Sequence, residues 1–67
     1  MNIKKLKIRR LEAGLSQRDL AEKSGVGIRA IQAYEQGWRN INKASAVSIL
    51  ALADALGCEP KEILEEV

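Results

Sequence analysis

The chain has 67 residues, including 11 Lys or Arg, nine Asp or Glu, one Cys and no His. This length allows one domain near the lower size limit for folding without disulfides or metals, and the Cys and His counts exclude an intrachain disulfide framework and a structural zinc site. No apolar run is long enough for a signal peptide or a membrane span, so we expect a cytoplasmic protein with no membrane partner.

The charge is unevenly distributed along the chain. Residues 1–43 hold ten basic and four acidic side chains, a net charge of +6, whereas residues 44–67 hold one basic and five acidic side chains, a net charge of −4. A basic N-terminal portion with an acidic tail suits a module that turns one side toward phosphate groups. For any single lysine, a solvated surface position is the simpler interpretation.

The first predicted helix starts with Asn2 as its cap and runs to about Ala13. Its apolar face includes a charged residue, Arg10, and a buried charge without a partner is costly. The candidate partner is Glu35, which follows an inward-facing Tyr34 in the third predicted helix. The alternative is that the two residues are independent surface charges.

The second predicted helix begins with a capping box. Ser16 and Asp19 have the Ser-x-x-Asp spacing in which each residue caps the other, so we expect a helix over residues 17 to about 24. Gly25 follows, and glycine permits the left-handed backbone conformation that ends a helix. The chain can then turn tightly into the next helix.

The third predicted helix covers residues 28 to about 36 and stops at Gly37, with Ile31 and Tyr34 facing inward. Two short helices joined by a glycine turn form a helix-turn-helix unit. The residues left facing outward are Ile28, Arg29, Gln32 and Ala33. Arg can bond bidentately to guanine and Gln to adenine, and an aliphatic group can contact the thymine methyl, so these four are candidates for reading DNA bases.

The run L-S-Q-x-x-L-A-x-x-x-G-V-x-x-x-x-I-x-x-Y-E-x-G over residues 15–37 resembles the Cro/repressor, or XRE-type, helix-turn-helix family. The likeness extends upstream to Arg10 and downstream to A-L-A-D-A-L-G-C-E-P-K-E-I-L. It implies an all-α fold over residues 1–67: a compact, five-helix, lambda-repressor-like DNA-binding domain with the helix-turn-helix at its second and third helices. It also implies that Arg10 and Glu35 join the first helix to the third.

Contacts to the DNA backbone are predicted at the helix starts and in the loop after the third helix. Helix N-termini expose free N–H groups that favour phosphate. In the resembled family, a Gln at the start of the second helix braces a phosphate, and basic or amide residues follow the third helix. The predicted phosphate contacts are Gln17, Arg18, Gly27, Arg39 and Asn40. The family usually has Ser or Thr in place of Gly27 and a polar residue in place of Ile28, which leaves local packing or a protein contact as the alternative for Ile28.

The remaining chain is predicted to form two further helices. Asn42 is the candidate cap of a helix over residues 43–56. Pro60 would be the first residue of a fifth helix. Trp38, in the loop before the fourth helix, is expected to cover the core. One face of the fourth helix is small and apolar, and its residues are Val47, Ala51 and Ala55. Either another subunit covers this face, or the alanines serve helix propensity.

These features predict a sequence-specific double-stranded DNA-binding transcriptional regulator, a repressor, that reads the major groove with its third helix. We expect a weak homodimer formed through the fourth and fifth helices. With no nucleophile–base pair, metal cluster or Gly-rich phosphate loop, we expect neither an enzyme nor a bound cofactor. The alternatives are a protein-interaction module, such as an antitoxin with a toxin partner and auxiliary DNA binding, and a phage or restriction–modification control protein.

Overall fold

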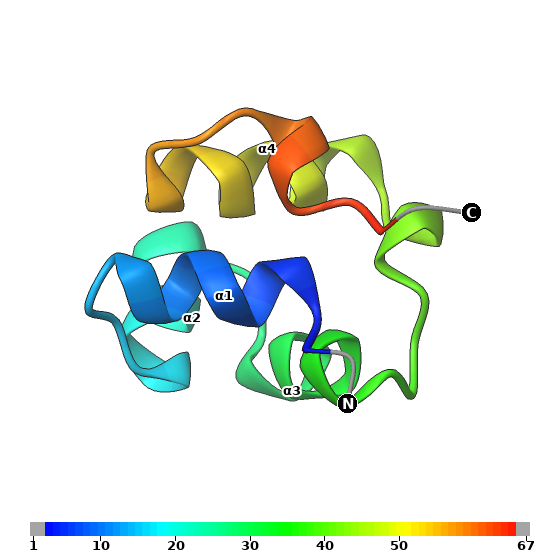
Figure 1. Cartoon of the computed structure of the whole chain (residues 1–67), viewed down its shortest axis with the longest axis horizontal. Helices are drawn as coiled ribbons and strands as arrows, with labels where there is room; N and C mark the ends of the chain where they lie inside the picture. Colours follow the sequence, from blue (N-terminus) through cyan, green and yellow to red (C-terminus); the bar gives the residue numbers. More distant parts are fainter. Residues whose placement is uncertain (1–2, 66–67) are drawn as a thin grey trace.

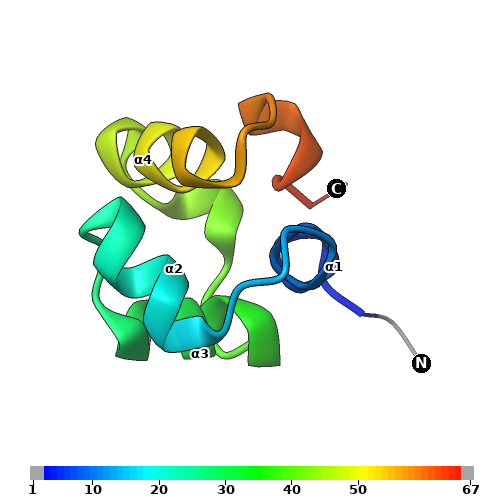
Figure 2. The ribbon, with the colours of Figure 1, turned by 90° about the vertical axis from the view of Figure 1, so that its left-hand side faces the viewer.

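The computed structural model describes residues 3–65. This part of the chain forms α-helices and 3₁₀ turns without a β-strand, in the order α1 (Lys5–Glu12), α2 (Gln17–Ser24), α3 (Ile28–Gln36), η1 (Ile41–Lys43), α4 (Ala46–Leu56) and η2 (Pro60–Glu62). The helix α3 lies on one side of the molecule and α4 on the opposite side, with α1 and α2 between them (Figures 1 and 2). No helix within residues 3–65 is long and apolar enough to cross a membrane.

One core holds the helices together. Its largest fully buried side chains come from every α-helix and from the segment after η2, and they are Leu6, Leu20, Ile31, Leu52 and Ile63. Because each element contributes one of these side chains, no helix can bury its apolar face without the others. The prediction of an all-helical fold is confirmed over the described residues.

The predicted start of the fourth helix is wrong. The helix α4 begins at Ala46, where the Ser45 hydroxyl accepts a hydrogen bond from the Ser48 N–H at 3.1 Å. Asn42 does not cap this helix. Its amide instead donates to the Glu65 carbonyl at 2.7 Å and accepts from the Glu65 N–H at 2.8 Å. Asn42 therefore attaches the C-terminal segment to the loop that follows α3.

The predicted fifth helix is also wrong, and the described chain has four α-helices. Pro60–Glu62 forms a single 3₁₀ turn, within which the Glu59 N–H donates to the Glu62 carboxylate at 2.7 Å. The next residue, Ile63, is fully buried in the core. The chain must turn inward at this point to bury Ile63, so the helical path does not continue.

Two other segments differ from the sequence prediction. The helix α1 begins at Lys5 and ends at Glu12, and the predicted cap Asn2 lies outside the described residues. Trp38 does not cover the core: 76% of its surface is exposed. The core is closed beneath the same loop by the buried Ile41, so it has no space that requires an indole.

Candidate nucleic-acid interface

The start of α2 is fixed by the predicted capping box. The Asp19 N–H donates to the Ser16 hydroxyl at 3.0 Å, and the Ser16 N–H donates to the Asp19 carboxylate at 3.1 Å. This backbone hydrogen bond favours the ionised carboxylate and lowers the pKa of Asp19 from its ordinary value. Gln17 is thereby held at the first position of the helix.

The turn from α2 to α3 depends on glycine. Gly25 has φ of +77° and its N–H donates to the Ala21 carbonyl at 2.8 Å, which ends α2. Residues other than glycine are strained at this positive φ, because their Cβ atom clashes with the backbone. Gly27 then caps α3 without a side-chain hydrogen bond, so the N–H groups of the first turn of α3 receive no side-chain acceptor from the cap.

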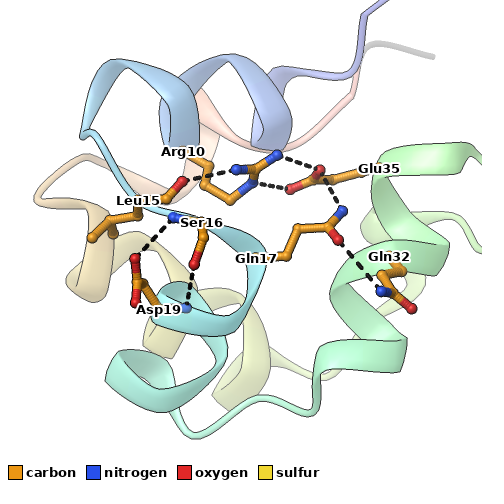
Figure 3. A network of polar contacts seen from close by, with 7 residues as sticks. All are labelled: Arg10, Leu15, Ser16, Gln17, Asp19, Gln32 and Glu35. Carbon is orange, nitrogen blue, oxygen red and sulfur yellow. Dashed lines mark hydrogen bonds and ion pairs between the residues drawn. The ribbon is translucent and has the colours of Figure 1, made fainter.

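Arg10 and Glu35 form a bidentate ion pair that joins α1 to α3 (Figure 3). Arg10 Nε donates to Glu35 Oε2 at 2.8 Å, and Nη2 donates to Oε1 at 3.1 Å. The two side chains are only 9% and 1% exposed. Arg10 Nη1 also donates to the Leu15 carbonyl at 2.8 Å, so one arginine positions α1, α3 and the segment that enters α2.

Gln17 lies between this ion pair and the outer side of α3. Its Nε2 donates to Glu35 Oε1 at 3.0 Å, and its Oε1 accepts from Gln32 Nε2 at 3.4 Å (Figure 3). One N–H of Gln17 is not used in these two contacts. The link between Gln17 and Gln32 was not expected from the sequence, because it depends on how two helices pack.

The exposed side of α3 holds three of the four predicted base-reading residues. Ile28 and Arg29 are exposed, and Gln32 is half-buried beside Gln17. The outward position predicted for Ala33 is wrong, since this residue is only 7% exposed. Its side chain is a single methyl group, and the chain after α3 folds back here: the N–H groups of the next loop donate to the Ala33 carbonyl.

The residues predicted to contact the DNA backbone remain accessible to solvent. Arg18 and Gly27 are exposed on α2 and at the start of α3, and Arg39 and Asn40 are exposed in the loop. The guanidinium carbon of Arg39 lies 5.2 Å from the centre of the Tyr34 ring, a cation–π contact. The Asn40 side chain accepts from the Asn42 N–H at 2.9 Å and so shapes the loop.

The structure adds Lys4 to the basic groups near this loop. Lys4 lines a polar pocket together with Gly37, Arg39 and Asn40. It comes from the start of the chain, more than thirty residues before the loop, and nothing in the local sequence around residue 39 predicts it.

The acidic residues of η2 lie away from α3, whereas Glu65 lines the same pocket as Arg39 and Asn40. The segment that carries η2 lies beside α4 and α1, whereas α3 lies on the opposite side (Figures 1 and 2). Glu62 forms an ion pair with Arg9 of α1 at 2.9 Å, so part of the negative charge is matched there. No group of three His, Cys, Asp or Glu residues within 3–65 could hold a metal ion.

Comparison with known proteins agrees with this geometry. The helix-turn-helix family model matches residues 6–63. The crystal structure of the restriction-modification controller protein C.AhdI from Aeromonas hydrophila is similar, with a TM-score of 0.77 and 42% sequence identity over 90% of this chain and 86% of that chain. No curated protein matches the chain. The chain therefore belongs to the Cro/repressor-type helix-turn-helix family, which consists of DNA-binding transcriptional regulators rather than enzymes.

Proposed function

We propose that this protein is a sequence-specific repressor that places α3 in the major groove of double-stranded DNA. The observation that carries the proposal is the division of α3 into two sides. Ile31 and Tyr34 are buried in the core, whereas Arg29 and Gln32 lie on the side that is open to a ligand. A helix fits the major groove, where Arg and Gln can distinguish guanine and adenine.

Contacts to phosphates would set the position of α3 without reading sequence. Gln17, Arg18 and Gly27 lie at or near the starts of α2 and α3, and Arg39 and Asn40 lie in the loop beyond α3. These groups flank the proposed reading helix along the chain on both sides. Contacts of this kind fix register and orientation on the duplex.

Removing one reading side chain should change base preference at one position. We expect Arg29→Ala and Gln32→Ala each to lose about 1–3 kcal/mol of discrimination at a single base pair, because each removes a possible bidentate contact. Selection of bound sequences from random DNA measures this. The matched control is Arg18→Ala, which should weaken binding to all sequences by a similar factor. An unchanged ranking of sequences in both α3 variants would show that α3 is not the reader.

The likeness to C.AhdI favours control of a restriction–modification system as the biological setting. That protein is a restriction-modification controller protein, and it shares 42% of its residues with this chain over most of both lengths. A restriction or modification gene beside the gene for this chain would support the assignment. A toxin gene in that place would favour the antitoxin alternative instead.

We also propose that the protein acts as a weak homodimer, because one short helix reads too few base pairs to be specific. Two copies on a palindromic site would place their α3 helices roughly 34 Å apart. The structure changes the predicted pairing surface. Ala55 is buried, so it does not belong to this surface. Val47 and Leu50 are exposed on α4, and Ala51 is half-buried.

The dimer can be tested by sedimentation with and without a palindromic duplex. We expect mostly monomer for the free protein and two copies on the DNA, since binding to adjacent half-sites strengthens a weak pairing. Leu50→Glu should reduce the two-copy complex without unfolding the protein, because Leu50 is exposed. A complex with one copy, even at high protein concentration, would exclude the dimer.

A further inference from the structure

The loop that follows α3 is joined to a distant part of the chain by three side chains in series, each of which binds the backbone of the next residue. The Asn40 side chain accepts from the Asn42 N–H at 2.9 Å. The Asn42 amide donates to the Glu65 carbonyl at 2.7 Å and accepts from the Glu65 N–H at 2.8 Å. The Glu65 carboxylate accepts from the Lys5 N–H at 2.7 Å. These bonds link the loop, Glu65 and the start of α1.

The contact between Asn42 and Glu65 requires a carboxamide. The backbone of Glu65 offers one donor and one acceptor, and a carboxamide can answer both, whereas a carboxylate has no donor. Both residues are half-buried. Their neighbours Ile41 and Ile63 are buried in the core, so the two segments that meet here are each anchored beside the contact.

Glu65 also supplies a cap that α1 does not have in its own sequence. Lys4, at the cap position, makes no side-chain cap hydrogen bond, and the first turn of α1 has no acidic residue. The Glu65 carboxylate reaches the first N–H of this helix, that of Lys5, from 60 residues away. A negative charge is favourable at a helix N-terminus. Residues 63–65, which we call the strap, are therefore held by the core, by the loop and by α1.

The strap fixes one end of the loop that carries Arg39. The other end is fixed to α3, because the N–H groups of Trp38 and Arg39 donate to the Ala33 carbonyl at 2.9 and 3.2 Å. Between these two attachments, the Arg39 guanidinium carbon lies 5.2 Å from the centre of the Tyr34 ring. A loop that is already ordered loses less conformational entropy when its side chains bind a ligand.

We propose that Asn42 is a positioning residue for DNA binding: through its contact with the strap, it holds the loop in the conformation in which Arg39 meets a phosphate. This inference rests on the proposed phosphate contacts of the loop. The Asn42 amide is occupied by Glu65, so Asn42 acts on the overall affinity for DNA and not on base preference.

The test uses the salt dependence of binding, because its slope reports how many phosphates the protein neutralises. One duplex is titrated at several salt concentrations with the wild-type protein, Arg39→Ala and Asn42→Leu. Loss of one phosphate contact in Arg39→Ala should reduce the slope of log K against log salt by about 0.9. Asn42→Leu has a similar size and changes no charge. We expect it nevertheless to reduce the slope toward that of Arg39→Ala, and to weaken binding to all sequences by one common factor.

A double variant shows whether Asn42 acts through Arg39. When Arg39 is already replaced, Asn42→Leu should reduce the slope no further, because the contact that Asn42 positions is absent. The matched control is the Arg18→Ala background, where Asn42→Leu should have its full effect, since Arg18 belongs to α2 and not to the loop. Equal reductions on the two backgrounds would overturn the inference.

The outcomes separate this inference from the proposed function. If Arg39→Ala leaves the slope unchanged, the proposed phosphate contact and the inference are both wrong. If Arg39→Ala reduces the slope and Asn42→Leu does not, the phosphate contact stands and the inference alone is wrong. A reduced slope in both single variants, with no further reduction in the double variant, supports the inference.

A second variant and a measurement without DNA guard against a folding defect. Asn42→Ser is too short to bind both polar groups of Glu65 but stays polar, so it replaces Asn42→Leu if that variant is unstable. In the free protein, trypsin should cut faster after the exposed Arg39 in either variant, because the loop opens locally. The increase should be smaller after Lys23, an exposed residue of α2. Equal increases at both sites, or none after Arg39, would overturn the inference.

Discussion

Replacing Arg10 with alanine is expected to destabilise the fold by about 3–5 kcal/mol, because it leaves the buried Glu35 carboxylate without its charged partner. Arg10 donates to both oxygens of Glu35 and to the Leu15 carbonyl, so three hydrogen bonds are lost with the charge. For a domain of this size, such a loss should lower the melting temperature by about 12–40 °C. Thermal unfolding followed by circular dichroism measures the shift.

Arg9 provides the matched control for this experiment. It is the neighbouring arginine and also forms two ion pairs, with Glu12 at 3.2 Å and with Glu62 at 2.9 Å, but its side chain is 41% exposed. Exposed pairs contribute about 0–1 kcal/mol each, so Arg9→Ala should cost at most about 2 kcal/mol and lower the melting temperature by less than Arg10→Ala does. If Arg10→Ala melted within one or two degrees of the wild type, the Arg10–Glu35 pair would have no structural importance.

Replacing Leu20 with alanine is expected to cost about 2–5 kcal/mol, because it leaves a cavity at the centre of the core. Leu20 is fully buried and belongs to α2, which packs against both α3 and α4. The relative placement of the two helices of the helix-turn-helix should therefore loosen together with the core. Chemical denaturation measures the loss as a lower free energy of unfolding in water. An unchanged dependence of this free energy on denaturant concentration shows that stability alone has changed.

Leu11→Ala removes the same atoms from an exposed site of α1. Surface substitutions away from special features usually change stability by less than about 0.5 kcal/mol. The difference between these two variants therefore isolates the effect of burial. Similar losses for Leu20→Ala and Leu11→Ala would contradict the position of Leu20 in the core.

The helix-turn-helix could be predicted from the sequence because its signals are local. Ser16 and Asp19 are three residues apart and cap each other, and Gly25 and Gly37 end their helices with positive φ. Each signal acts within one turn of the chain, so spacing alone identifies it. The ion pair between Arg10 and Glu35 spans 25 residues. It could be predicted because the charge of Arg10 lies on an otherwise apolar helix face and therefore needs a partner.

The wrong predictions for the start of the fourth helix and for a fifth helix result from contacts between distant segments. Asn42 and Ser45 are both suitable caps, and the choice between them depends on Glu65, which occupies the Asn42 amide from 23 residues away. The fifth helix fails because burial of Ile63 redirects the chain after one turn. Local propensity contains no information on either partner.

The position of Trp38 determines which spectroscopic signals can report on this protein. Trp38 is the single tryptophan of the chain, and its indole is already in water in the folded state. Its fluorescence should therefore change little when the core melts, and unfolding is better followed through helical circular dichroism. Trp38 precedes Arg39 in the chain and follows Gly37, the cap of α3. Its emission is thus a built-in optical probe for any molecule that docks against the loop, without a dye or an added label.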